Sequence, residues 1–206
     1  MNGHLTQEDV DSIIEEIPAS RLGTTEDVAN AVYDRTGAIM LSGECAQGDY
    51  PVECVKTMVK IANRVEPEIH YWKRFSNNED LDLSNDVTKI AYSACVTAKN
   101  MNADAIVTYT HTGDSVRKLA GLGAGCPILA ITDNKRTFHQ LALAWNVTPI
   151  YVEAGATIEE TIDKGIEKLK NKEILEKGDV VVLSGGAKTF SSGMTKKVIG
   201  GILRID

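Results

Sequence analysis

The chain has 206 residues, of which 43% are hydrophobic and 25% are charged, and its formal net charge is −7. This composition is typical of a globular protein with one domain or two small ones. The charge is uneven, because residues 1–85 hold 7 basic and 16 acidic side chains, whereas residues 86–206 hold 15 and 13. No basic stripe is present to meet a phosphate backbone, which excludes nucleic acid as the main partner.

Cysteines, histidines and apolar runs exclude further classes. The four cysteines form no CxxC pair, and the four histidines show no ligand spacing to them, so we expect buried thiols in a reducing compartment and no metal. No apolar run approaches the ~20 residues of a membrane span, and the first ten residues have no signal-peptide core. We therefore expect a cytoplasmic protein with no membrane partner.

The first 66 residues predict the order helix, helix, strand, helix. The first helical pattern begins at Thr6 and stops at Pro18, and the second begins at Thr24 or Thr25. Residues 38–42, AIMLS, are typical of a short strand buried in a parallel sheet. The last helix has Pro51 near its first turn.

Residues 67–85 favour a linker between two domains. This segment lacks hydrophobic periodicity and is rich in Asn, Asp and Glu. Tyr71, Trp72 and Phe75 nevertheless indicate that the start of the segment packs against another part of the protein.

Residues 86–206 alternate helices with short apolar strands. Strands are predicted at 105–110, 127–132, 147–152, 179–185 and 198–205, and helices at 86–101, 113–123, 134–145 and 157–171. The alternation predicts a three-layer αβα domain of the α/β class, with a mostly parallel sheet covered on both faces. Only a short loop separates the last two strands, which predicts an antiparallel hairpin at one edge.

The segment 108–118, TYTHTGDSVRK, predicts an anion site, because ligands of open α/β sheets bind where strands end and helices begin. The residues assigned to phosphate here are Thr110, Thr112, Gly113, Ser115 and Arg117. Asp114 argues against the site, since a carboxylate on the same turn repels phosphate. The alternative is an ordinary turn in which Thr112 or Asp114 caps the helix.

The segment 184–197, SGGAKTFSSGMTKK, combines three glycines, three lysines and the hydroxyls of Thr189, Ser191 and Ser192. The residues assigned to phosphate here are Ser191, Ser192, Gly193 and Lys196. The alternative is a flexible hairpin loop that lysine makes soluble. Both segments follow parallel strands and are expected to open on the same sheet edge, so together they predict one phosphate pocket.

The segment DVANAVYDRTGAIMLSGECAQGDYPVECVKTMVKIA, residues 27–62, resembles pyruvate kinase, in which a DVANAV helix leads to a MLSGET strand end and a GxYPxEAV helix. Cys45 stands where threonine is usual and Cys54 where alanine is usual. The chain after residue 86 is similar to the regulatory carboxy-terminal domain of this family. The family's TxSGxSA motif matches Thr110, Thr112, Gly113 and Ser115, and its GxxGTTN loop matches the neighbourhood of Ser191, Ser192, Gly193 and Thr195.

The resemblance implies that residues 1–66 are a partial (β/α)₈ barrel segment whose strand ends at Ser42–Glu44. The family's catalytic lysine, phosphate-clamping arginine, and potassium and magnesium ligands lie on earlier strands, and only Thr6 matches a residue near the substrate. The resemblance therefore implies that this chain holds no Mg²⁺ or K⁺, which the parent enzyme uses, and transfers no phosphoryl group alone.

Three functions stay open at this point. The first is the regulatory and assembly portion of pyruvate kinase, a glycolytic enzyme that converts phosphoenolpyruvate and ADP to pyruvate and ATP, with a sugar phosphate or nucleotide as effector. The second is a stand-alone sensor of phosphorylated metabolites or a partner-binding module. The third is a subunit that completes a split kinase with the missing barrel portion. The family forms tetramers, and the apolar strand 198–203 suits edge pairing in a homo-oligomer, unless it is covered within the monomer.

Overall fold

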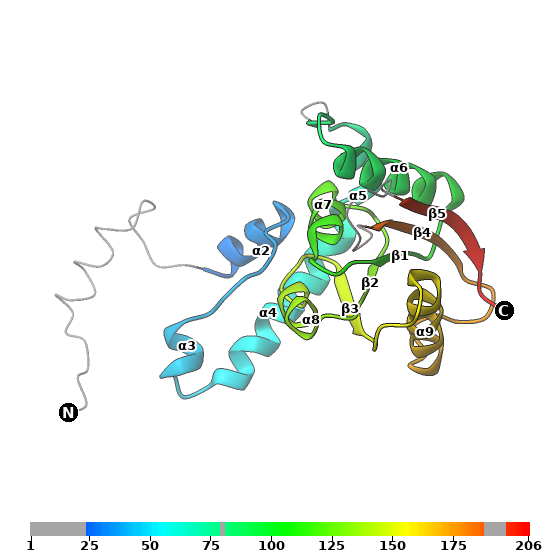
Figure 1. Cartoon of the computed structure of the whole chain (residues 1–206). Helices are drawn as coiled ribbons and strands as arrows, with labels where there is room; N and C mark the ends of the chain where they lie inside the picture. Colours follow the sequence, from blue (N-terminus) through cyan, green and yellow to red (C-terminus); the bar gives the residue numbers. More distant parts are fainter. Residues whose placement is uncertain (1–23, 79–80, 188–196) are drawn as a thin grey trace. The chain divides into compact units, whose positions relative to one another are not determined.

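The computed structural model of the chain describes residues 24–78, 81–187 and 197–206. It divides into two compact units, Met1–Glu68 and Ile69–Asp206. The helix predicted from Thr6 lies outside the described residues. The two units are described separately below, and Figure 1 labels their helices and strands.

The described part of the first unit is helical. It contains α2 (Thr25–Tyr33), α3 (Gly43–Ala46), α4 (Pro51–Val65) and the 3₁₀ turn η1 (Glu66–Glu68). Helix α2 has acidic residues in its first turn and α4 has proline there, so the sequence signals for both helices are confirmed. Both α2 and α3 contact α4, but no residue of 24–68 is buried.

The strand predicted at 38–42 is wrong. Residues 38–41 have no regular secondary structure, and α3 begins directly after Ser42. A strand must exchange backbone hydrogen bonds with a neighbour, and residues 24–68 contain no other strand to provide them. Met40, in the middle of the apolar run, is 84% exposed.

The second unit contains the predicted five-stranded sheet. Its strands are β1 (Ala105–Tyr109), β2 (Ile128–Thr132), β3 (Val147–Tyr151), β4 (Val180–Ala187) and β5 (Lys197–Arg204). Its helices are α5 (Tyr71–Ser76), α6 (Asp86–Met101), α7 (Asp114–Leu122), α8 (Lys135–Leu141) and α9 (Ile158–Asn171). Each strand and helix predicted after residue 86 is confirmed within a few residues.

The strand order is β3-β2-β1-β4-β5. The pairs β1–β2, β2–β3 and β1–β4 are parallel, and β4–β5 is antiparallel, as the short connection predicted. Strand β1 therefore lies between β2 on one side and β4 on the other. Because β2 and β3 extend the sheet in one direction and β4 in the other, the order reverses next to β1, at the crevice where ligands of such sheets bind.

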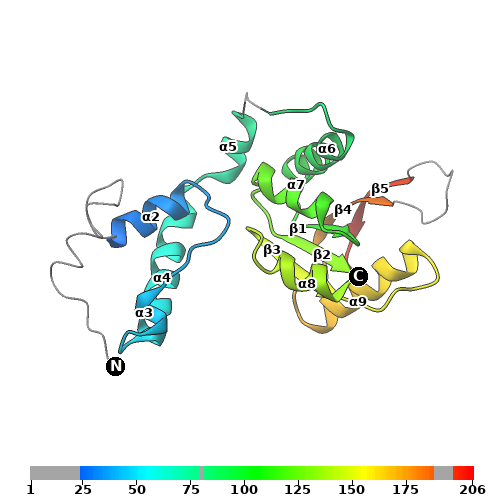
Figure 2. The same cartoon turned by 60° about the vertical axis from the view of Figure 1, so that its left-hand side comes forward.

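Helices cover both faces of the sheet (Figures 1 and 2). One apolar cluster packs α6, α7 and α8 against Ile106, Ile128 and Val182. The other packs α9 against the opposite face, where Ile131 is fully buried and contacts the helix at Gly165 so closely that a Cβ on this glycine would overlap it. This three-layer arrangement confirms the predicted fold class.

Aromatic residues near the start of the second unit pack as the sequence predicted. Phe75 in α5 is buried, and its ring lies 5.3 Å from Tyr92 and 5.9 Å from Trp72. Tyr71 lies 4.9 Å from Trp145. Helix α5 thus begins inside the range 67–85 that reads as a linker. In the part of the chain that the structure describes, no helix is long and apolar enough to cross a membrane.

Candidate functional site

The turn between β1 and α7 begins with a buried threonine and ends with a glycine in the left-handed region. Thr110 is 5% exposed, and its Oγ1 accepts a hydrogen bond of 2.9 Å from the amide of Gly113. Gly113 has a φ of +89° and is the N-cap residue of α7. Because few residues other than glycine adopt this conformation, the glycine sets the direction in which the helix begins.

Within the described part of the chain, no side chain caps the N-terminus of α7. Gly113 has no side chain to offer, and neither Thr112 nor Asp114 accepts a capping hydrogen bond, so the alternative of an ordinary capped turn is wrong in that detail. By contrast, Asn85, Asn134 and Thr157 cap α6, α8 and α9. The first turn of α7 therefore keeps backbone N–H groups that can bind an anion. Thr112 is exposed and Ser115 half-buried on this turn.

Arg117 folds back over the turn. Its guanidinium donates to the carbonyl of Thr112 at 3.1 Å and to Oε1 of Gln140 at 3.3 Å. It also lies 3.6 Å from the carboxylate of Asp114, which is largely exposed. A Cβ at Gly113 would lie only 2.9 Å from the guanidinium, so the missing side chain makes room for the arginine. The guanidinium is thus held at the turn, where the carboxylate that it pairs with is that of Asp114.

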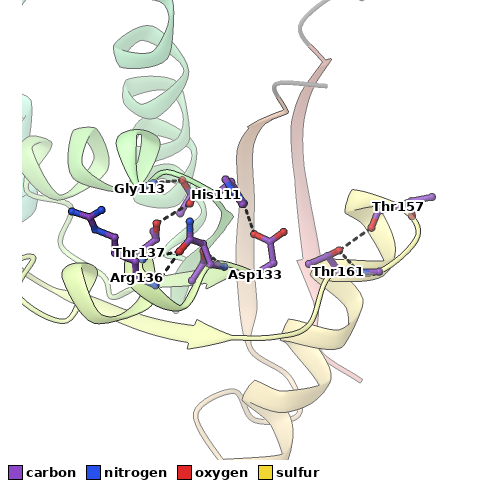
Figure 3. Close-up of polar contacts among 11 residues, drawn as sticks. His111, Gly113, Asp133, Arg136, Thr137, Thr157 and Thr161 are labelled. Atoms are coloured by element: carbon purple, nitrogen blue, oxygen red, sulfur yellow. Dashed lines mark hydrogen bonds and ion pairs between the residues drawn. The ribbon is translucent and has the colours of Figure 1, made fainter. Parts of the chain in front are cut away.

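A second set of contacts joins the turn to the segment that follows β2 (Figure 3). Nδ1 of His111 lies 2.7 Å from Oδ1 of Asp133, whose side chain is 15% exposed. A carboxylate can only accept, so this bond requires a proton on Nδ1. The hydroxyl of Thr137, a buried residue of α8, donates to the carbonyl of His111 at 2.8 Å.

Tyr109 belongs to the same group of contacts. Burial raises the pKa of its phenol to about 12, and the nearby Asp133 carboxylate, through its charge and its hydrogen bond to the phenol, adds to the shift. Asp133 thus interacts with the residues on both sides of Thr110. The sequence analysis missed Asp133 and Thr137. A signal existed for Asp133, a carboxylate directly after a buried strand, but none distinguished Thr137 from any other helical threonine.

Buried hydroxyls line the sheet beneath the turn. Thr108 pairs with Ser184 of β4 on one side and with Ala130 of β2 on the other, and it shares a face with Ile106 and Thr110 because alternate strand residues point the same way. Thr108 and Ser184 are both buried, and Oγ1 of Thr108 has no hydrogen-bond partner among the residues that the structure describes. Toward the carboxyl end of β1, the side chains on this face of the sheet therefore change from apolar to polar.

The hairpin between β4 and β5 starts from the same edge of the sheet. Strand β4 is parallel to β1, and its last residue, Ala187, pairs with Lys197, the first residue of β5. Several residues assigned to phosphate lie outside the described residues, namely Ser191, Ser192, Gly193, Thr195 and Lys196, as does Thr6. Among the described residues, no group of three or more His, Cys, Asp or Glu side chains is arranged to hold a metal ion.

Two family models match the chain. The model described as "Pyruvate kinase, alpha/beta domain" matches residues 88–198, and the model described as "Pyruvate kinase, barrel domain" matches residues 6–55. The first of these spans more than half of the chain.

Full-length relatives and a solved structure agree with the family models. Pyruvate kinase from Clostridium acetobutylicum is 36% identical over 178 residues, which is 86% of this chain and 38% of the relative. The enzyme from Sporosarcina psychrophila is 34% identical over 190 residues, 90% of this chain and 32% of the relative. The structure of Cryptosporidium parvum pyruvate kinase in complex with ADP superposes with a TM-score of 0.75 at 27% identity, covering 92% of this chain and 37% of that one. The chain spans about a third of the length of these proteins.

Proposed function

The chain belongs to the pyruvate kinase family, and from this premise we propose that residues 69–206 are a regulatory and assembly domain that binds a phosphorylated effector at the turn between β1 and α7. The effector is a sugar phosphate or a nucleotide. The domain acts within an enzyme that transfers a phosphoryl group between phosphoenolpyruvate and ADP in the cytoplasm.

The observation that carries this proposal is the place of the turn in the sheet. The turn follows β1, the strand next to which the order reverses, and β4 beside it leads into the glycine- and lysine-rich hairpin. An uncapped helix of nine residues, α7, begins there with its N–H groups and positive dipole end. Buried hydroxyls of Thr108, Thr110 and Ser184 supply a polar floor. These features together suit a phosphate group.

Arg117 supplies the full positive charge of the proposed site. It already lies against Gly113, and a phosphate on the turn would replace the long 3.6 Å contact with Asp114 by shorter charge-assisted bonds. Substituting Arg117 by alanine is expected to weaken phosphate binding by about 1.5–3 kcal/mol. Lys118→Ala is the matched control, because Lys118 carries the same charge on the next, exposed position of α7.

The test compares phosphorylated and unphosphorylated pairs, namely glucose 6-phosphate with glucose, ribose 5-phosphate with ribose, and AMP with adenosine. At a concentration of one hundred times its dissociation constant, a bound ligand stabilises the protein by about 2.7 kcal/mol, which a thermal-shift assay detects. We expect at least one phosphorylated member to stabilise the chain and its partner to have no effect. Absence of any stabilisation, or equal stabilisation by both members of a pair, would refute phosphate recognition.

Asp114 favours a second candidate function, a stand-alone sensor or partner-binding module. Its carboxylate occupies the first position of α7 and pairs with Arg117, so the turn is less positive than a simple phosphate site requires. If Asp114→Asn creates phosphate binding that the natural chain lacks, the second function is favoured. If the natural chain already binds phosphate, the effector domain is favoured.

We also propose that β5 joins two copies of the chain. It lies at the edge of the sheet, pairs only with β4 among the described strands, and exposes 51% of Ile202. An open edge strand offers a row of backbone groups to a second strand.

A further inference from the structure

Hydrogen bonds fix the turn at residues 110–113 to the segment that follows β2, which a connection on the protein surface does not require. Two residues that follow β2 reach it, Asp133 in the connection through the ring of His111 and Thr137 in α8 through the carbonyl of the same histidine. Both contacts meet at one residue, which lies between the two threonines assigned to phosphate.

We infer that Asp133 and Thr137 are positioning residues for the phosphate turn, holding His111 so that Thr110, Thr112 and Gly113 are set for the ligand before it arrives. This inference rests on the proposed function, since it concerns the same phosphate site. The two residues act through His111 and do not touch the ligand.

The burial of the two anchors supports this role. The Asp133 side chain is 15% exposed and Thr137 is 3% exposed, so water competes poorly for their hydrogen bonds. Asp133 also interacts with Tyr109, and it therefore fixes the chain on both sides of Thr110. From Thr110, the bond to the amide of Gly113 carries the constraint to the start of α7 (Figure 3).

The consequence for binding is a lower ordering cost. A turn of several residues loses conformational entropy when a ligand fixes it, and a turn that is already fixed loses less. Removing an anchor should therefore weaken binding although every group that touches phosphate is retained. It should also loosen the turn in the absence of ligand.

The test uses the full chain, with inorganic phosphate as the probe and amide NMR signals of the turn as the readout. Asp133→Ala is expected to weaken phosphate binding about tenfold, comparable to the loss of one good hydrogen bond. Thr137→Val removes only the hydroxyl and should weaken binding several-fold, while Thr137→Ser, which keeps it, should restore most of the affinity relative to Thr137→Val. Asp163→Ala, at an exposed carboxylate of α9, is the matched control.

Hydrogen exchange distinguishes positioning from general destabilisation. In Asp133→Ala the amide of Gly113 should exchange faster without ligand, while that of Val107 in the centre of β1 stays unchanged. Faster exchange at both amides, or wild-type phosphate affinity in Asp133→Ala and Thr137→Val, would overturn the inference and leave the proposed function intact. If Asp133→Ala does not fold, the comparison of Thr137→Val with Thr137→Ser tests the inference by itself. If the natural chain binds no phosphate, the proposed function fails and the inference fails with it.

Discussion

Residues 24–68 and residues 69–206 follow the same local rules of helix formation, yet only the second region has an interior. Helix α4 has 15 residues and buries none of them, whereas α6 has 16 residues and buries five. The difference between the regions is the sheet of the second region, which packs helices α6 to α9 against its two apolar faces. Helix signals are therefore local, but burial and the stability that follows from it depend on strands that pair with one another.

The largest expected difference between the two regions is in the reactivity of their cysteines. Cys45 and Cys54 are half-buried, whereas Cys95 and Cys126 are buried. Burial, with a smaller contribution from Cys126, raises the pKa of Cys95 from the ordinary 9.0 to about 12, and burial with the charge of Asp104 raises that of Cys126 to about 11. At pH 8 about one in a thousand or fewer of these two thiols is ionised, and only the thiolate reacts.

Iodoacetamide should therefore alkylate Cys45 and Cys54 at least a hundredfold faster than Cys95 and Cys126 in the native chain at pH 8. Mass spectrometry of peptides identifies each site, and alkylation in urea, where all four should react alike, is the control. Equal rates in the native chain would contradict the burial described here. Because the folded pKa values are raised, the thiols support folding fully below about pH 9 and progressively less as pH rises toward 11 and 12.

The fold of residues 86–206 could be predicted from the sequence because its signals agree with each other. Each strand is a short apolar run, each helix has a starting or stopping residue, and the short connection after β4 requires an antiparallel partner. The apolar run at 38–42 predicts a strand as clearly as the run that forms β2. However, β2 lies between β1 and β3, and the sequence of a single run does not reveal which strands will lie beside it.

The candidate site was predictable in part. Thr110, Gly113 and Arg117 follow one another in the sequence, so their proximity at the turn follows from the strand–turn–helix pattern. Asp133 and Thr137 lie more than twenty residues away, and only the parallel pairing of β1 with β2 brings them to His111. Periodicity and local motifs carry no information about such a contact.

Core substitutions should give the next largest contrast. Leu119 in α7 is 1% exposed and belongs to the cluster on the α6 face, whereas Met40 is 84% exposed. Leu119→Ala is expected to lower the free energy of unfolding by about 2–5 kcal/mol, through lost burial and the cavity left behind. Met40→Ala should change it by less than about 0.5 kcal/mol.

Urea titration followed by tryptophan fluorescence measures both variants, because the two tryptophans, Trp72 and Trp145, lie in the second region. A Met40→Ala transition shifted as far as that of Leu119→Ala would mean that the two regions unfold as one unit and that residues 24–68 contribute to the core.

The smallest contrast concerns two helix caps of the same residue type. Thr157 caps α9, where its Oγ1 accepts from the amide of Glu160 at 3.1 Å, and α9 packs against the sheet. Thr24 precedes α2 and contacts Asp27, in a region with no buried residue. Thr157→Ala should lower the free energy of unfolding by about 1 kcal/mol, the usual value of a threonine cap, and Thr157→Ser should restore it.

Thr24→Ala should leave the tryptophan transition in place and reduce only the helical signal in circular dichroism, because the hydrogen bonds of α2 stabilise α2 alone unless the helix is packed against a core. A shift of the tryptophan transition by Thr24→Ala would show that the first region is coupled to the sheet in spite of its exposure.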